Sequence, residues 1–411
     1  MDRNIESTNV LIIGKSGVGK SSLVNYLFGE DLQKVGVGAP VTEKTIQEFT
    51  YRYDEHFEMH IYDTWGLEPS AQKADQWKEL IFEAIENHDR KSIREWFNTI
   101  IFCLNVKSSR IEDFELDIME ELLREKNHLT IVLTHCRSKD DPDGIVLRDR
   151  VKEILQKREI DPPDDRNFVF VSNVRKKLLG GASVEKFGKE EVFVSIIRNV
   201  WASLKSKVPY QARKKFEIEF QLKRAELLKK PDKLKWIAPF MRMVSINRLE
   251  QEINKNCDAF VRDLVEDIDN MYMEALGYYS ELSQKYAIIG FQLSQDDISA
   301  SARIHFDAKH TVENQVAADL HTLRKRVQFM RRILDDKRVE SRLRKTIINF
   351  RVLIKDTGKI REDIKKDLEQ FMDVVKQQLE DHLREIEASL NSLEIDDLYL
   401  FQADPGSLPS L

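Results

Sequence analysis

The feature that most constrains this chain is a short apolar run followed at once by a glycine-rich turn. Residues 10–13 are Val-Leu-Ile-Ile, and the eight residues from Gly14 to Ser21 read G-K-S-G-V-G-K-S. The apolar run predicts a strand covered on both faces, and the residues after the turn predict a helix that begins at Lys20. Glycines let the backbone bend back so that its N–H groups face one point, which suits a cluster of phosphate oxygens. This order of elements therefore predicts a phosphate-binding site.

The expected phosphate-binding residues are those of the turn and of the first helical positions. A helix N-terminus adds the positive end of a dipole. Lys20 supplies a point charge for the outer phosphates, and the Ser21 hydroxyl can bind Mg²⁺. The alternative is a glycine-rich turn that binds no ligand. The position of this turn between a strand and a helix disfavours that alternative. The residues are Gly14, Ser16, Gly17, Val18, Gly19, Lys20, Ser21 and Ser22.

A second motif, D-x-x-G, begins at Asp63 directly after another predicted strand. A carboxylate at the end of a strand can reach Mg²⁺, and Gly66 can turn its N–H onto a terminal phosphate. In the loop between the two motifs, a threonine could bind Mg²⁺ and sense that phosphate. Thr42 is the first choice and Thr45 the second. The expected metal ligands are thus Ser21, Thr42 and Asp63, and the expected catalytic residues are Lys20, Thr42 and Gly66.

Together these motifs resemble those of the translation-factor-like class of GTPases, over roughly residues 5–205. The arrangement is most similar to the branch that includes septins, the immunity-associated GTPases and the Toc chloroplast-import GTPases. Residues 19–29, Gly-Lys-Ser-Ser-Leu-Val-Asn-Tyr-Leu-Phe-Gly, also resemble the Era-type ribosome-assembly GTPases. The resemblance implies GTP or GDP as the ligand and Mg²⁺ as the cofactor.

The element that would recognise the base departs from the usual N/T-K-x-D pattern, because Arg137 stands where the Asp is expected. The sequence Leu-Thr-His that ends at His135 is similar to the Toc and immunity-associated GTPases, in which the His stacks on the base. In those proteins an Asn after the next strand helps to recognise guanine, and Asn173 stands at that point. The alternative is that His135 is a capping residue and Asn173 a turn residue, which would leave ATP as a possible ligand.

The residue after Gly66 is Leu67, where Ras-like enzymes have a Gln that orients the attacking water. We therefore expect slow intrinsic hydrolysis. A second copy docked across the nucleotide could supply the missing group, as in relatives that pair through their G domains. The C-terminal helices offer a second route to a homodimer.

Eleven of the fifteen glycines lie at or before Gly188, so turns are concentrated in the first half of the chain. This half alternates strand-like and helix-like segments, which predicts an α/β P-loop NTPase domain with a mostly parallel sheet. Helical periodicity follows and predicts an all-α bundle or coiled coil. The expected domains are residues 1–207, 208–400 and a flexible tail at 401–411. The expected elements are strands at 10–13, 100–104, 129–133 and 168–171, a hairpin at 48–53 and 57–62, and a helix at 190–205.

The composition fits a cytoplasmic protein, with 33 % charged residues, a net charge of −6 and three cysteines without pairing or metal spacing. No signal peptide or membrane-spanning run is found. The leading hypothesis is a nucleotide-dependent switch with an unknown effector. The alternatives are a dynamin-like membrane protein using basic residues 213–235, a ribosome- or RNA-associated GTPase using the basic stretch 322–366, and a nucleotide-binding scaffold without turnover.

Overall fold

The computed structural model describes residues 6–29, 33–34, 46–52, 57–64, 71–108, 110–173, 176–177, 183–229 and 357–391, with parts of 255–278. These residues fall into two compact units. The first contains the described residues up to Lys207 together with Tyr278. The second contains the described residues of 208–277 and of 357–391.

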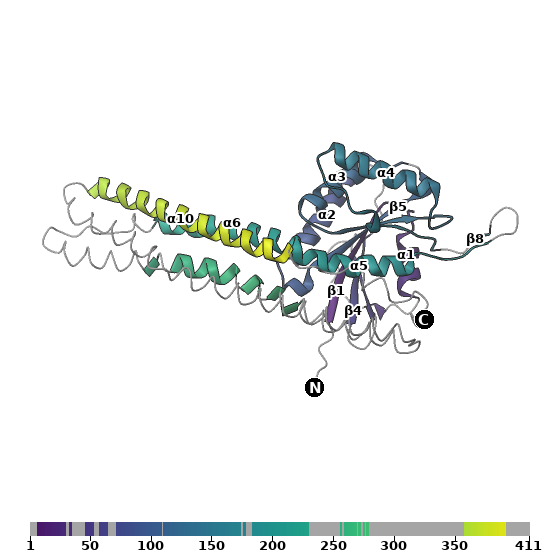
Figure 1. Ribbon diagram of the computed structural model, residues 1–411, viewed down its shortest axis with the longest axis horizontal. Coiled ribbons are helices and arrows are strands. Elements are labelled where there is room, and N and C mark those ends of the chain that lie inside the picture. Colours follow the sequence, from purple (N-terminus) through teal and green to yellow (C-terminus); the bar gives the residue numbers. More distant parts are fainter. Residues whose placement is uncertain are drawn as a thin grey trace, which may run out of the picture. The chain divides into compact units, whose positions relative to one another are not determined.

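A seven-stranded sheet forms the centre of the first unit (Figure 1). Five strands run parallel in the order β4-β1-β5-β6-β7, and β3 and then β2 continue the sheet antiparallel beyond β4. The bounds are β1 Glu6–Ile13, β2 Gln33–Lys34, β3 Gln47–Arg52, β4 Phe57–Asp63, β5 Phe97–Asn105, β6 Leu129–Thr134 and β7 Phe168–Phe170. A separate two-stranded hairpin consists of β8 Lys176–Lys177 and β9 Ser183–Val184.

Helices cover both faces of the sheet, which is why the central strands are continuous apolar runs. Every residue of β5 except the last is buried, and so is every residue of β6. The predicted strands, the hairpin and the α/β class are confirmed, although β7 ends one residue before the expected Val171. The helices of this unit are α1 Lys20–Phe28, α2 Ala71–Asp89, α3 Asp113–Arg124, α4 Pro142–Lys157 and α5 Lys189–Lys205, with short 3₁₀ turns at Ile93–Glu95, Val106–Ser108 and Asp165–Asn167.

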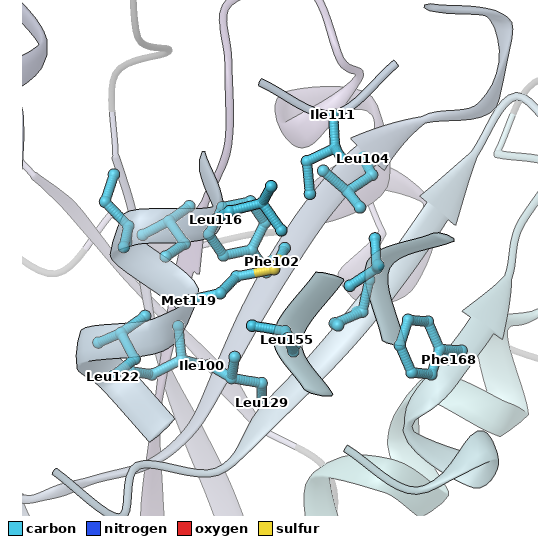
Figure 2. Close-up of a cluster of buried hydrophobic side chains, with 14 of the residues drawn as sticks. Ile100, Phe102, Leu104, Ile111, Leu116, Met119, Leu122, Leu129, Leu155 and Phe168 are labelled. Carbon is cyan, nitrogen blue, oxygen red and sulfur yellow. The ribbon is translucent and has the colours of Figure 1, made fainter. Parts of the chain in front are cut away.

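The main hydrophobic core lies between the sheet and the helices α2, α3 and α4. Figure 2 shows Ile100, Phe102 and Leu104 of β5 packed with side chains of α3 and α4. From α3 come Leu116, Met119 and Leu122, and from α4 comes Leu155. Alternate residues of β5 point into this core, as strand geometry requires.

The contact between α5 and the opposite face of the sheet is unusually polar. Ser195, Asn199 and Ser203 recur at four-residue steps on α5, and all three are buried. Ser195 Oγ lies 2.7 Å from Thr130 Oγ1, and Asn199 Nδ2 donates to the same oxygen at 3.0 Å. Ser203 Oγ donates to the main-chain oxygen of Asn98 at 3.3 Å. These bonds satisfy polar groups that would otherwise be costly to bury.

In the second unit, two long helices pack against each other in antiparallel directions. They are α6 Lys207–Lys229 and α10 Thr357–Asn391. Arg213 pairs with Glu387, Glu217 with Lys376, and Arg224 with Glu369, so rising numbers on α6 meet falling numbers on α10. Described helical residues within 255–278 pack on α6 as well, for example Phe260 on Phe220 with ring centroids 5.6 Å apart.

The apolar seam of α10 is buried within its own chain. The seam residues Leu368, Met372, Val375, Leu379, Leu383, Ile386 and Leu390 are at most 5 % exposed. Pro209 lies inside the first turn of α6, where a proline removes no helical hydrogen bond. Among the helices that the structure describes, none is long and apolar enough to cross a membrane. The expected tail at 401–411 and most of the basic stretch 322–366 lie outside the described residues.

Candidate functional site

The glycine-rich turn runs directly over β5, and its glycines are required by that geometry. Gly14 has φ +146°, and a Cβ built on it would lie 2.7 Å from the main-chain oxygen of Cys103. Gly19 has φ +97° and is the N-cap of α1. Both conformations disfavour any residue with a side chain. The predicted order of strand, turn and helix is therefore present, with α1 beginning at Lys20.

Lys20 lies over the turn with little access to solvent. Its Nζ donates hydrogen bonds to the main-chain oxygens of Gly14 at 2.9 Å and of Lys15 at 3.0 Å. Burial lowers the pKa of the Lys20 ammonium, and Cys103 and Asp63 nearby oppose that effect. Burial also raises the pKa of the Cys103 thiol to about 12, so this thiol stays neutral. The ammonium group is thus held at the turn as a donor for phosphate oxygens.

Asp63 lies at the end of β4, level with Ile12 of β1 in the sheet. Burial raises the pKa of its carboxyl to about 6, against the opposing effects of Lys20 and of a hydrogen bond from the Ser21 side chain. Asp63 Oδ1 is buried and accepts no hydrogen bond from the described residues. A carboxylate with an unused buried oxygen, next to a serine hydroxyl, fits the oxygen ligands that Mg²⁺ prefers. The side chains of Ser21 and Asp63, both chosen from the sequence as metal ligands, therefore lie next to each other.

Two threonines fix the main chain around the turn, and the sequence analysis assigned neither a role. Thr134 Oγ1, at the end of β6, lies 2.6 Å from the main-chain oxygen of Val18 and 3.1 Å from that of Leu104. Thr64 Oγ1 donates to the main-chain oxygen of Ile12 at 2.8 Å. In the sequence, a threonine directly after an apolar strand-like run is the one signal that could have indicated these side-chain bonds to the main chain.

His135 and Asn173 both lie close to Gly19, at the edge of the turn. A Cβ built on Gly19 would lie 3.4 Å from Asn173 Nδ2 and 3.7 Å from His135 Nε2. Asn173 Nδ2 donates to the main-chain oxygen of Gly19 at 3.2 Å, whereas Asn173 Oδ1 is buried and accepts no hydrogen bond within the described part of the chain. His135 has φ +66°, a left-handed conformation that is uncommon for residues other than glycine. The two residues chosen for base recognition are therefore brought together beside the phosphate-binding turn.

Arg137, which occupies the usual position of the base-binding Asp, belongs to a closed ion-pair network. Its backbone N–H donates to Asp141 Oδ2 at 2.7 Å, and its Nη2 donates to Asp143 Oδ2 at 2.6 Å. The Asp141 side chain is buried and also caps α4 by accepting from the backbone N–H of Asp143 at 3.1 Å. The Asp141 carboxylate is therefore already saturated with donors and is a poor candidate for a base contact.

Several predicted site residues cannot be placed. Thr42 and Thr45 of the intervening loop, and Trp65, Gly66 and Leu67 of the D-x-x-G motif, lie outside the described residues. Of the remaining turn residues, Ser16, Gly17 and Ser22 are exposed and Val18 is buried. The described part of the chain contains no cluster of three or more His, Cys, Asp or Glu residues able to hold a metal by themselves.

Comparison with known proteins places this geometry in context. Residues 9–135, less than half of the chain, match the sequence model of a family described as 50S ribosome-binding GTPase. The GTPase Der of Novosphingobium aromaticivorans is 25 % identical over 138 residues, which are 33 % of this chain and 29 % of that protein. The translocase of chloroplast 33 of Arabidopsis thaliana is 25 % identical over 206 residues, 47 % of this chain and 59 % of that protein.

The chain thus spans between 29 % and 59 % of the length of these two relatives. Among solved structures, the septin GTPase domain from Chlamydomonas reinhardtii is similar, with 17 % identity, coverage of 48 % of this chain and 91 % of that one, and a TM-score of 0.34. The sheet order, the turn from Gly14 to Ser21 and the match over residues 9–135 together show that the first unit has the G-domain fold of the P-loop GTPases.

Proposed function

We propose that this protein is a Mg²⁺-dependent GTP-binding switch that hydrolyses GTP slowly. The observation that carries the proposal is the meeting of Lys20, Ser21 and Asp63 at the glycine-rich turn, where Asp63 Oδ1 is buried and accepts no hydrogen bond from the described residues. Such a site combines the ammonium group of Lys20 with oxygen ligands for a divalent cation. This combination suits the charge of a nucleoside triphosphate.

The residues of the turn divide the work of binding. The backbone N–H groups from Gly17 to Lys20 surround the inner phosphates, and Lys20 Nζ binds the outer ones. Ser21 and Asp63 are the ligands that would hold Mg²⁺, which when bound neutralises the charge of the β- and γ-phosphates. Thr42 and Gly66 keep their predicted roles, the first at the metal and the second at the γ-phosphate.

Guanine selectivity rests on Asn173 and His135. An Asn amide can donate to the guanine O6 and accept from the guanine N–H groups, and Asn173 Oδ1 has no partner among the described residues. His135 lies beside the same turn and offers a ring on which the base can stack. The carboxylate of Asp141 is occupied by Arg137 and the helix cap, which supports recognition through these two residues.

Hydrolysis is the attack of water on the γ-phosphorus, with cleavage of the bond to the β-phosphate oxygen and release of GDP and phosphate. Leu67 cannot polarise that water, so we propose that an isolated copy turns over slowly. A second copy that docks across the nucleotide would supply the missing group. Turnover per molecule should then rise with protein concentration, and a constant rate over a wide range would contradict the dimer.

The nucleotide specificity can be tested by titrating GTP, GDP, ATP and ADP with Mg²⁺. We expect wild type to prefer guanine nucleotides, and His135→Ala and Asn173→Ala to reduce that preference by about tenfold or more, since a site built to bond a polar group discriminates strongly. Lys139→Ala is the matched control, because Lys139 lies on the same loop, is exposed and pairs with Glu191. Equal affinity of wild type for guanine and adenine nucleotides would contradict the guanine assignment. Lys20→Ala should lose triphosphate binding.

The helical unit is proposed to read the nucleotide state for an effector that the sequence does not identify. A lipid-binding role for its basic residues is less well supported, because Arg213, Lys223 and Arg224 are paired with Glu387, Asp263 and Glu369 of the same unit. The buried seam of α10 favours packing within one chain over an intermolecular coiled coil. Cys103 and Cys136 are buried and form no disulfide among the described residues, which is consistent with the reducing cytoplasm that we propose as the compartment.

A further inference from the structure

Lys15, the residue after Gly14, connects the phosphate-binding turn to a distant helix. Its main-chain oxygen accepts a hydrogen bond from Lys20 Nζ at 3.0 Å, so residue 15 helps to place the ammonium group of the site. Its own side chain points to the beginning of α3. There Lys15 Nζ lies 2.7 Å from Glu112 Oε1 and 3.0 Å from Glu115 Oε2.

The start of α3 is built to receive this ammonium group. Glu112 is the N-cap of α3, and the buried carboxylate of Glu115 accepts the backbone N–H of Glu112 at 3.0 Å in a capping box. Lys15 Nζ also lies 5.2 Å from the centre of the Phe114 ring. Lys15 is therefore the charged partner of a carboxylate that is only 3 % exposed, and its loss would leave that carboxylate with one backbone donor.

We infer that Lys15 is a positioning residue that holds the phosphate-binding turn against α3 and thereby sets the place of Lys20 Nζ. The inference rests on the proposed binding of GTP. A lysine next to phosphates could instead bind them directly, but two carboxylates already neutralise the charge of Lys15. The link also extends further, because α3 pairs with α2 through Glu121 and Lys78 at 2.5 Å. A displacement of α3 would then change the affinity of the site for the nucleotide.

The test compares full-length wild type with Lys15→Met, Glu115→Gln and the double variant. The dissociation constant and dissociation rate are measured for fluorescent GDP and for a non-hydrolysable GTP analogue. We expect each single variant to weaken binding by about tenfold, the range for a charge-assisted contact. The double variant should bind no more weakly than Lys15→Met, because both changes remove the same contact. Lys15→Arg keeps the charge and the N–H donors for the two carboxylates, and should restore affinity to within about threefold of wild type.

Lys91→Met is the matched control, since Lys91 also pairs with a carboxylate, that of Glu95, but on the surface away from the turn. Its nucleotide affinity should equal that of wild type. Unchanged affinity in Lys15→Met would overturn the inference, and so would losses that multiply in the double variant, which would make Lys15 a direct phosphate ligand. Wild type that binds neither nucleotide would instead refute the proposed function itself. Melting temperatures without nucleotide identify any variant that fails to fold. If Lys15→Met is such a variant, Lys15→Arg tests the inference: nucleotide affinity within about threefold of wild type supports it, and a larger loss contradicts it.

Discussion

The most informative stability test concerns Lys207, a lysine with no exposed surface. Its Nζ lies 2.8 Å from Asp89 Oδ1 at the end of α2, and donates to the main-chain oxygen of Phe97 at 3.1 Å. The same ammonium lies 5.7 Å from the centre of the Trp96 ring. Asp89 is itself 8 % exposed, so the ion pair is closed off from water.

Lys207→Met removes the positive charge and keeps a side chain of similar length. The change leaves the Asp89 carboxylate buried without its cation, which costs about 3–5 kcal/mol in comparable buried pairs. We expect the free energy of unfolding of the first unit to fall by about that amount in urea titrations. Tryptophan emission is a suitable probe, because Trp96 is buried beside the ion pair.

Replacing both partners separates the loss of the pair from the loss of packing. Lys207→Met combined with Asp89→Leu should recover most of the stability, since no unpaired charge remains. Lys91→Met, in an exposed pair with Glu95, should cost less than about 1 kcal/mol. A Lys207→Met protein as stable as the Lys91→Met control would refute the reasoning.

Three further predictions follow from the described residues. Burial lowers the pKa of His128 to about 4, so below about pH 6.5 the unfolded chain binds a proton that the folded chain does not. The free energy of unfolding, measured by urea titration, should therefore fall by up to about 3 kcal/mol as the pH drops from 6.5 to 4. His128→Gln should reduce this pH dependence, and an unchanged pH dependence in that variant would contradict the role of His128. Gly188→Ala places a Cβ 2.4 Å from the main-chain oxygen of Phe170 at φ +95°, and should lower the melting temperature more than Gly29→Ala, which meets no atom within 4 Å. Asp63→Asn should remove the effect of Mg²⁺ on nucleotide affinity, and unchanged magnesium dependence would exclude Asp63 as a ligand. The same change should raise the stability of the nucleotide-free protein by about 3 kcal/mol at pH 8, because burial raises the pKa of this carboxyl to about 6 and so disfavours its charged form.

Local features of the fold could be predicted from the sequence. The apolar run at 10–13, the turn after it and the hairpin before Asp63 depend on neighbouring residues, and each is present. Asp63 and Ser21 were chosen from their motifs, a carboxylate at the end of a strand and a hydroxyl at the start of a helix. His135 and Asn173 were chosen from the resemblance to the Toc and immunity-associated GTPases. The structure brings the members of each pair close together.

Contacts between distant residues escaped the sequence analysis. Thr134 holds the main chain of Val18, 116 positions earlier, and Lys207 is buried against Phe97, 110 positions earlier. The sequence pattern does not distinguish either residue, because a single polar residue looks alike in the sequence whether its side chain faces water or a buried partner. The substitution of Arg137 for the usual Asp was visible, but its pairing with Asp141 became apparent only from the structure.

The position of β1 has a consequence for how the chain is made. This strand is synthesised before the other described strands, yet its partners in the sheet are β4 and β5, which end at Asp63 and Asn105. Until residue 105 has emerged, the run at 10–13 lacks the second neighbour that buries it. At about 5–20 residues per second, the nascent chain carries an apolar strand that lacks one of its two neighbours for several seconds. This interval is when the chain is most open to chaperones and to pairing with another copy, and it ends when β5 closes against β1.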